Sequence, residues 1–117
     1  IIKRYFENFS NWLNDEFIIC NKYNHKDKYN YHAFTIILKK NEREKFLKFL
    51  KRKKIIAFIS FEALHLSKMG KKWITKKTKL NNTNEIIKKI VRLPMHNKLT
   101  INEVDYISKK VKEYFKK

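Results

Sequence analysis

The sequence has 117 residues with 29 basic and 11 acidic side chains, which give a formal net charge of +18, and 43% of its residues are apolar. This length and apolar content predict one domain with a single hydrophobic core and argue against intrinsic disorder, and no apolar run approaches the about 18 residues that a membrane-spanning helix needs. The single glycine excludes a glycine-rich phosphate loop, and the single cysteine excludes an internal disulfide.

Residues 1–14 and 15–30 predict a helix followed by a loop. Apolar side chains recur in the first stretch at the three- and four-residue spacing of one helix face. They are Ile1, Ile2, Tyr5, Phe6, Phe9, Trp12 and Leu13. Asn14 and Asp15 interrupt this pattern, and the polar run that follows is typical of a loop.

The next stretch predicts a strand, a helix and a second strand. Residues 31–39 are rich in β-formers and indicate a buried strand. We expect Asn41 to cap the helix that follows. Glu42 and Glu44 would then lie in its first turn, at the positive end of the helix, and the basic residues 51–54 at its negative end. Residues 55–61 predict the second, short strand.

A surface loop and a short helix are expected next. Residues 64–80 are rich in lysine without a sustained period, which predicts the loop. The short helix should start at Thr83, with Ile86, Ile87 and Ile90 facing inward. Residues 91–94 should then leave the helix as an extended piece, which Pro94 ends.

Thr100 and Glu103 predict the start of a final helix as a capping box, in which the hydroxyl and the carboxylate satisfy free backbone amides. The apolar face of this helix consists of Ile101, Val104, Ile107, Val111, Tyr114 and Phe115. The order of elements predicts an α+β fold, with a small, mainly antiparallel sheet of about three strands packed with amphipathic helices.

The strong positive charge leaves two interpretations open. Clustered lysines release counterions from phosphate backbones, so a small basic nucleic-acid-binding module is an alternative function. The composition favours a solvated surface instead, because Lys, Asn and Ile supply 52 of the 117 residues, as an A/T-rich genome would encode, and Arg occurs only four times. A membrane-surface role for the final helix is weaker, because its apolar stripe is typical of a core.

Three segments carry a family resemblance. The first covers residues 30–38, Asn30-Tyr31-His32-Ala33-Phe34-Thr35-Ile36-Ile37-Leu38, and is similar to a His-x-Phe/Tyr strand. The second runs from residue 43 to residue 70 and is similar to a helix, a strand and a Pro-Leu-His loop. The third is Arg92-Leu93-Pro94-Met95 with the capping box after it, which is similar to a closing Leu-Pro-Met segment and final helix. Together, over roughly residues 30–117, they resemble the C-terminal small domain of the DegT/StrS family of nucleotide-sugar aminotransferases, most closely the dTDP-4-amino-4,6-dideoxygalactose transaminases.

The resemblance implies that residues 1–117 form one small domain, laid out as in fold-type-I aminotransferases. In that family a large domain holds pyridoxal 5'-phosphate through a lysine, and the resemblance implies that residues 1–117 do not include that domain. The implied parent enzyme is a homodimer that transfers an amino group from glutamate to a nucleotide-linked 4-keto-6-deoxy sugar, for cell-surface polysaccharide synthesis. The segment alone should hold no cofactor and be inactive. Helical periodicity in the first residues also suggests part of a longer chain, and a cytoplasmic location is expected because no charged-then-apolar leader opens the sequence.

Four side chains are expected at the substrate by this resemblance: His65, His32, Ser60 and Arg92. His65 could bond a sugar hydroxyl or a pyrophosphate oxygen, or be a plain surface histidine. His32 could equally be a structural histidine at the start of a strand, and Arg92 could pair with a core carboxylate or with a substrate anion. Where the family commonly reads His-Tyr-x-Pro-Leu-His, this chain reads Ser60-Phe61-Glu62-Ala63-Leu64-His65, so the first imidazole and the proline are missing.

No catalytic residue, cofactor-binding residue or metal ligand is predicted within the chain itself. Cys20, His25 and His32 lie five and seven residues apart, which does not match a zinc-ligand pattern. A Ser-His-Asp set with an elbow glycine cannot be drawn, and most acidic residues lie beside lysines, as solvated pairs do.

Overall fold

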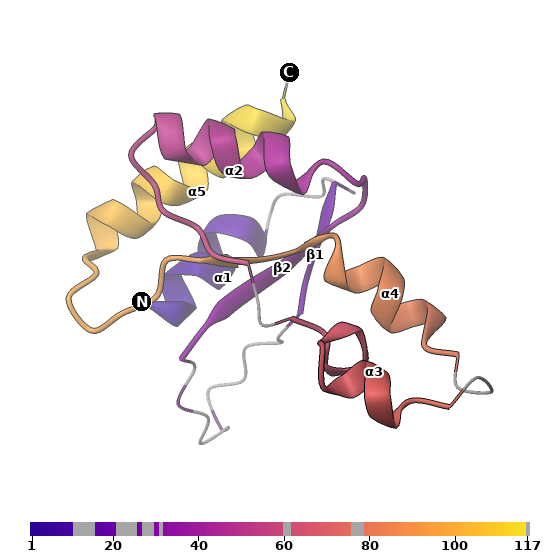
Figure 1. Ribbon diagram of the computed structural model, residues 1–117. Coiled ribbons are helices and arrows are strands. Elements are labelled where there is room, and N and C mark those ends of the chain that lie inside the picture. Colours follow the sequence, from indigo (N-terminus) through magenta and orange to yellow (C-terminus); the bar gives the residue numbers. More distant parts are fainter. Residues whose placement is uncertain are drawn as a thin grey trace.

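The computed structural model describes residues 1–10, 16–20, 26, 30, 32–59, 62–75 and 79–116. In chain order, its elements are α1 (Ile2–Ser10), β1 (Phe17–Ile19), β2 (Phe34–Leu38), α2 (Arg43–Arg52), the 3-10 turn η1 (Leu64–Leu66), α3 (Gly70–Trp73), α4 (Asn81–Ile87), β3 (Ile90–Leu93) and α5 (Ile101–Phe115). The expected α+β class is confirmed (Figure 1).

A three-stranded antiparallel sheet of order β1-β2-β3 forms the centre of the fold. Phe17 lies opposite Leu38, and Phe34 lies opposite Leu93. Two strand predictions were wrong in detail. The stretch expected to be loop over residues 15–30 contains β1, and residues 55–59 contribute only an isolated bridge between Phe58 and Arg92, next to β3 rather than β2.

One face of the sheet carries the hydrophobic core. The side chains of β2 alternate, so that Phe34, Ile36 and Leu38 are buried while Thr35 and Ile37 on the other face are half-buried. The buried face packs against the apolar sides of α1, α2 and α5, whose core residues include Tyr5 and Phe46. None of the described α1, α2 or α5 helices covers the opposite face of the sheet (Figure 1).

Aromatic stacking and one ion pair join α1 to the rest of the core. The Tyr5 ring lies 4.6 Å from the Phe34 ring, and the buried Tyr5 hydroxyl donates to the backbone oxygen of Pro94 at 2.8 Å. On the outer side, the Arg4 guanidinium donates two hydrogen bonds to Asp105 of α5, at 2.7 and 2.8 Å. Hydrogen bonds from Arg4 and Asn8 lower the pKa of the Asp105 carboxyl to about 2.

The helix boundaries confirm some expectations and correct others. The capping box is present, because the Thr100 hydroxyl accepts from the Glu103 amide at 3.2 Å and the Glu103 carboxylate accepts from the Thr100 amide at 2.7 Å. Asn41 does not cap α2, since Glu42 occupies that position without a side-chain hydrogen bond. The predicted helix residues 11–14 lie outside the described residues, so α1 is traced only to residue 10.

Residues 64–93 differ most from the prediction. The expected loop over residues 64–80 contains η1 and α3, and α4 begins at Asn81 instead of Thr83. Ile86, expected to face inward, is 40% exposed, and Ile90 belongs to β3 rather than to the helix. The α3 and α4 segments lie beside the sheet, away from α2 and α5 (Figure 1). None of the helices traced here has the length and apolarity that crossing a bilayer requires.

Candidate functional site

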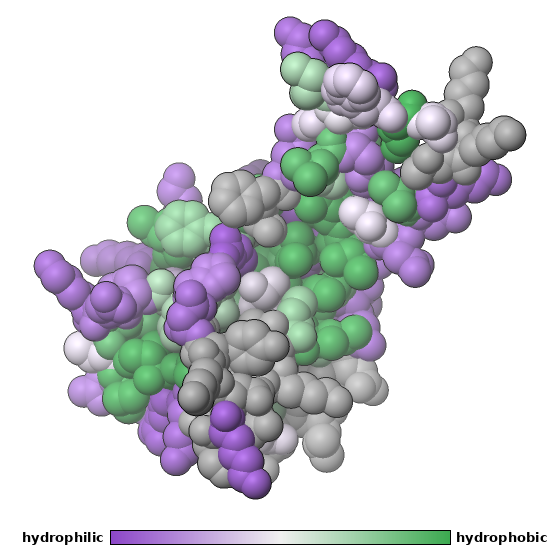
Figure 2. Space-filling model, turned by 90° about the horizontal axis from the view of Figure 1, so that it is seen from below, coloured by the Kyte–Doolittle hydropathy of each residue, from purple (hydrophilic) through white to green (hydrophobic). Residues whose placement is uncertain are grey.

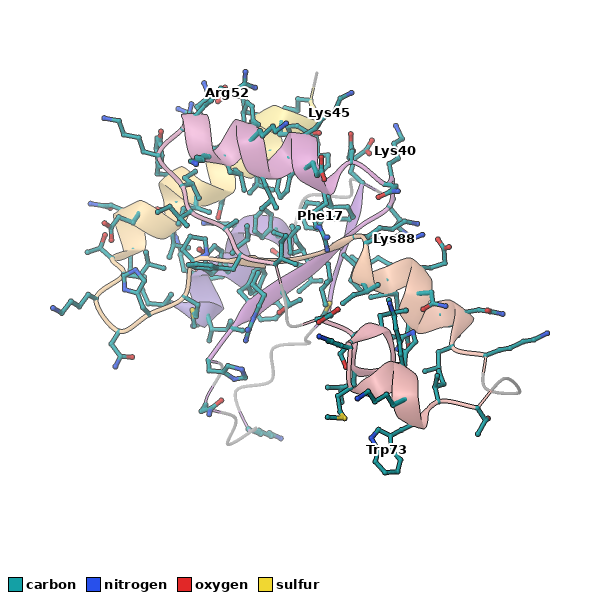
Figure 3. All side chains as sticks on the ribbon, viewed as in Figure 1. Phe17, Lys40, Lys45, Arg52, Trp73 and Lys88 are labelled. Carbon is teal, nitrogen blue, oxygen red and sulfur yellow. The ribbon has the colours of Figure 1, made fainter. Side chains whose placement is uncertain are left out.

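Large apolar side chains are exposed along the described part of residues 56–73, namely 56–59 and 62–73, which we call the apolar segment. Six of them are more than half exposed: Leu64 (84%), Trp73 (80%), Ile56 (67%), Met69 (62%), Phe58 (56%) and Ile59 (54%). Seen from below, apolar residues lie in the open between hydrophilic ones (Figure 2), and Trp73 points away from the body of the molecule (Figure 3). Concentrated apolar exposure of this kind marks a surface that another structure covers.

A hollow continues the apolar segment toward α5. It measures about 710 Å³ and lies between residues 53–58 and residues 94–107. Its lining includes Ile56 and Phe58 from the apolar segment, and Pro94, Met95 and Tyr106 from the facing side. The apolar segment is therefore not a flat patch, because part of it opens into a concave surface that a side chain from a partner could enter.

The only glycine of the sequence shapes the η1–α3 turn. A Cβ atom on Gly70 would lie 1.7 Å from the backbone oxygen of Leu64, so no side chain fits there. The Gly70 amide donates to the Ser67 hydroxyl at 2.9 Å, and that hydroxyl donates to the Leu64 oxygen at 2.7 Å. This close approach fixes the backbone that carries Leu64 and His65.

His65 is tied to α4 by its side chain. Its Nε2 atom lies 2.5 Å from the Oδ1 atom of Asn84, and both residues are half-buried. None of the cavities described along the chain has His65 in its lining. The imidazole therefore joins η1 to α4 beside the apolar segment, and it is neither a free surface group nor a residue at the bottom of a described pocket.

The structure does not bring the other three predicted site residues together with His65. Arg92 lies in β3 on the sheet face that the core helices leave uncovered, opposite Thr35, and no carboxylate among the described residues pairs with it. His32 is exposed, and its backbone amide and ring lie 3.4 Å from the Asn30 side chain. Ser60 lies outside the described residues. In the traced part of the chain, no three His, Cys, Asp or Glu side chains could share a metal ion.

A basic cleft was missed in the sequence. It measures about 840 Å³ and is lined by Glu16, Lys40, Glu42, Lys45, Lys48, Lys51, Arg52, Tyr114 and Phe115. Figure 3 shows Lys40, Lys45 and Arg52 on the side of the molecule that α2 forms. The three-residue spacing of Lys45, Lys48 and Lys51, which places them on one side of a helix, was the available signal.

The cleft keeps a surplus of positive charge. Across the described residues, no ion pair joins any of its five cations to a carboxylate. Glu42 instead accepts a hydrogen bond from the Tyr114 hydroxyl at 3.1 Å. Burial, with this carboxylate as a smaller cause, raises the pKa of Tyr114 to about 12, so the phenol stays neutral.

Comparisons with known proteins agree on one family and one fold. The model of the DegT/DnrJ/EryC1/StrS aminotransferase family matches residues 1–112, whereas no curated protein matches the chain. Similar structures include the aminotransferase TlmJ from Streptoalloteichus hindustanus, with 15% identity and a TM-score of 0.80 over 97% of this chain and 29% of that one. Another is Helicobacter pylori PseC, an aminotransferase involved in the biosynthesis of pseudoaminic acid, with 19% identity and a TM-score of 0.78 over 97% and 30%.

A third similar structure is the PLP-form of the sugar aminotransferase Spr1654 from Streptococcus pneumoniae, with 20% identity and a TM-score of 0.72 over 96% of this chain and 29% of that one. At these identities the likeness concerns the fold. The chain thus spans less than a third of the length of each of these three proteins.

Proposed function

Because this chain belongs to the DegT/DnrJ/EryC1/StrS aminotransferase family, we propose that it forms the C-terminal small domain of a pyridoxal-phosphate-dependent sugar aminotransferase. The parent enzyme would transfer an amino group from glutamate to a nucleotide-linked 4-keto-6-deoxy sugar, as the dTDP-4-amino-4,6-dideoxygalactose transaminases that the sequence resembles do. We further propose that it works in the cytoplasm as a homodimer and serves cell-surface polysaccharide synthesis. The match over residues 1–112 and the share of less than a third of each relative's length support a small domain of a larger protein.

The apolar segment is the observation that carries this proposal. Leu64 and Trp73 are at least four-fifths exposed, and water-exposed apolar surface of this density is unfavourable unless another surface covers it. We propose that the large domain of the same enzyme is the partner, packed against the apolar segment and the uncovered face of the sheet. Arg92 lies on that face, so this packing would bring it to the boundary between the two domains.

The described residues do not fit a resident pyridoxal phosphate. A lysine that holds this cofactor needs a sheltered amine, an acid for the pyridine nitrogen and a cradle for the phosphate. No described lysine is buried, and Gly70 is used inside the η1–α3 turn. We therefore propose that the large domain holds the cofactor, which supplies the electron sink for the amino transfer.

The proposed work of this chain is to orient the sugar nucleotide and exclude water. Closure of the small domain would cover the reacting groups, which strengthens hydrogen bonds there because the surroundings become less polar. His65, Arg92, His32 and Ser60 remain the proposed substrate contacts. Of these, His65 lies within the apolar segment, next to its most exposed residue, Leu64.

Reconstitution with a large-domain polypeptide from the same source tests the proposal. The mixture should convert bound pyridoxal phosphate to its pyridoxamine form when glutamate is added, seen as a change in the visible absorption band, whereas the chain alone should show no change. Replacing Trp73 with glutamate should prevent association. The matched control is Ile101→Glu, at a residue that is 46% exposed and outside the apolar segment. Association without any absorption change would contradict the proposed function.

A second candidate, polyanion binding, is favoured by the basic cleft alone. Several unpaired cations facing one hollow attract a phosphate chain through counterion release. If this candidate is correct, a triple change of Lys45, Lys48 and Lys51 to Gln should weaken binding of single-stranded DNA. It should also reduce the slope of log binding constant against log salt concentration by about 2, since each of three lost phosphate contacts contributes about 0.7 on a single strand. The control is the double change of Lys71 and Lys72 to Gln, which also removes one positive charge per residue and should have little effect on either the affinity or the salt slope. Weak binding that ignores salt would remove this candidate.

A further inference from the structure

The contact between His65 and Asn84 joins two elements that lie 19 residues apart in the chain. The Oδ1 atom of Asn84 has lone pairs and no hydrogen, so it can only accept a hydrogen bond. The Nε2 atom of His65, 2.5 Å away, must therefore be the donor. A neutral imidazole has one N–H, and with that hydrogen on Nε2 the Nδ1 atom keeps a free lone pair.

We propose that Asn84 is a positioning residue that fixes His65 in the Nε2–H form, so that Nδ1 is offered to the substrate as a hydrogen-bond acceptor. The inference rests on the proposed function of this domain. An acceptor binds a donor such as a hydroxyl or amino group of the sugar, and it is repelled by the oxygens of a pyrophosphate. From the sequence, either a sugar hydroxyl or a pyrophosphate oxygen could be the partner of His65. The hydrogen bond to Asn84 favours the hydroxyl, because an acceptor at Nδ1 needs a partner that can donate.

The surroundings of His65 hold the imidazole in this arrangement from both sides. On one side, the Gly70–Ser67–Leu64 hydrogen bonds fix the backbone of η1 immediately before His65. On the other side, Asn84 is anchored in α4, where its backbone N–H donates to the backbone oxygen of Leu80 at 2.9 Å. Covering the apolar segment with the large domain would exclude water here, and a hydrogen bond between half-buried groups then becomes harder to exchange for one to water.

Nitrogen-15 NMR of the imidazoles in the 117-residue chain tests the tautomer directly. In spectra recorded at about pH 8.5, the shifts of Nδ1 and Nε2 report which nitrogen of each imidazole carries the hydrogen. His65 is assigned with the variant His65→Gln, and the other three histidines serve as references in the same spectrum. We expect the wild-type His65 to be held in the Nε2–H form.

The variants of Asn84 distinguish positioning from general stability. Asn84→Leu should lower the ratio of the Nε2–H form to the Nδ1–H form by about fivefold, which corresponds to losing a hydrogen bond of about 1 kcal/mol. Asn84→Asp keeps an acceptor oxygen and should restore the wild-type ratio. The control is Asn82→Leu on the exposed surface of the same helix, which should leave the ratio unchanged. A wild-type His65 in the Nδ1–H form, or the same ratio in Asn84→Leu and wild type, would overturn the proposal.

A kinetic measurement in the reconstituted enzyme separates this inference from the proposed function. Asn84→Leu should raise the KM for the nucleotide sugar and leave the half-reaction with glutamate unchanged, and Asn84→Asp should restore the KM. If reconstitution fails while the tautomer result holds, the domain assignment is at fault and the Asn84 contact stands. If both half-reactions fall equally in Asn84→Leu, the residue acts on folding or docking, and the positioning role is wrong.

Discussion

Replacing Gly70 with alanine should open the η1–α3 turn without unfolding the domain. The new Cβ would lie 1.7 Å from the Leu64 oxygen and 2.7 Å from the Leu64 carbonyl carbon, whereas ordinary contact begins at 3.4 Å. The obstacle is backbone, which cannot rotate aside as a flexible side chain could. The turn must therefore separate by roughly 1.7 Å at this point, which breaks the hydrogen bonds made around it.

Two opposing effects set the size of this change. Alanine is favoured over glycine in a helix by about 1 kcal/mol. Against this, separation of the turn loses the hydrogen bonds from the Gly70 amide to Ser67 and from the Ser67 hydroxyl to Leu64, at about 1 kcal/mol each, and strains whatever contact remains. The two hydrogen bonds account for about 2 kcal/mol, the helix preference of alanine offsets about 1 kcal/mol, and backbone strain adds about 1 kcal/mol, so we expect a net local loss of about 2 kcal/mol.

Amide hydrogen exchange measures this local loss. The amides of Lys71 and Ile74, which donate to the oxygens of Ser67 and Gly70, should exchange about 30-fold faster in Gly70→Ala, because 1.4 kcal/mol corresponds to a factor of ten. The melting temperature should change little, since no residue of η1 or α3 belongs to the buried core. Ser67→Ala removes the same two side-chain hydrogen bonds without adding a Cβ at residue 70, so its increase measures their share of the loss without the steric clash. Unchanged exchange in Gly70→Ala, or a higher melting temperature, would refute the steric reasoning.

Three further predictions concern the body of the domain. Phe34→Ala should cost about 3 to 5 kcal/mol in urea unfolding because Phe34 is fully buried, whereas Phe58→Ala, at a side chain that is 56% exposed, should cost much less. Asp105→Asn removes the hydrogen-bonded pair with Arg4. The pKa of Asp105 in the folded chain, about 2, lies below the ordinary 3.8, so the ionised carboxylate stabilises the fold. The difference in unfolding free energy between the wild type and Asp105→Asn should therefore be largest above pH 4 and vanish as the pH falls toward 2, as unfolding at several pH values would show. Thr100→Ala should cost about 1 kcal/mol by losing the helix cap, and Thr100→Ser should restore it, as thermal unfolding would show.

Features of the fold that depend on local spacing could be predicted from the sequence. The periodic apolar residues of α1, α2 and α5 and the β-formers of β2 each give their element a buried side, so local pattern and final packing agree. The capping box at Thr100 is likewise a contact between residues three apart. The α+β class follows from these elements, because a small sheet can bury its apolar face only against such helices.

Features that depend on distant partners could be settled only by the tertiary structure. β1 has three residues, too few for a periodic signal, and it forms because β2 offers a free edge across an intervening stretch. The apolar residues at 55–61 were interpreted as a strand, yet among the described residues β3 pairs with this stretch only at Phe58. Ile56, Phe58 and Ile59 therefore remain exposed, whereas Ile55 belongs to the core.

The candidate site shows the same division between local pattern and tertiary contact. His65 could be singled out from its sequence neighbours, but its tie to Asn84 depends on how α4 folds back beside η1. The sequence alone determined which residues are apolar, charged or able to cap a helix, because those are properties of single side chains and their near neighbours. Only the tertiary structure decided which apolar residues stay exposed and which nitrogen of His65 is engaged, because both depend on atoms brought close from elsewhere in the chain.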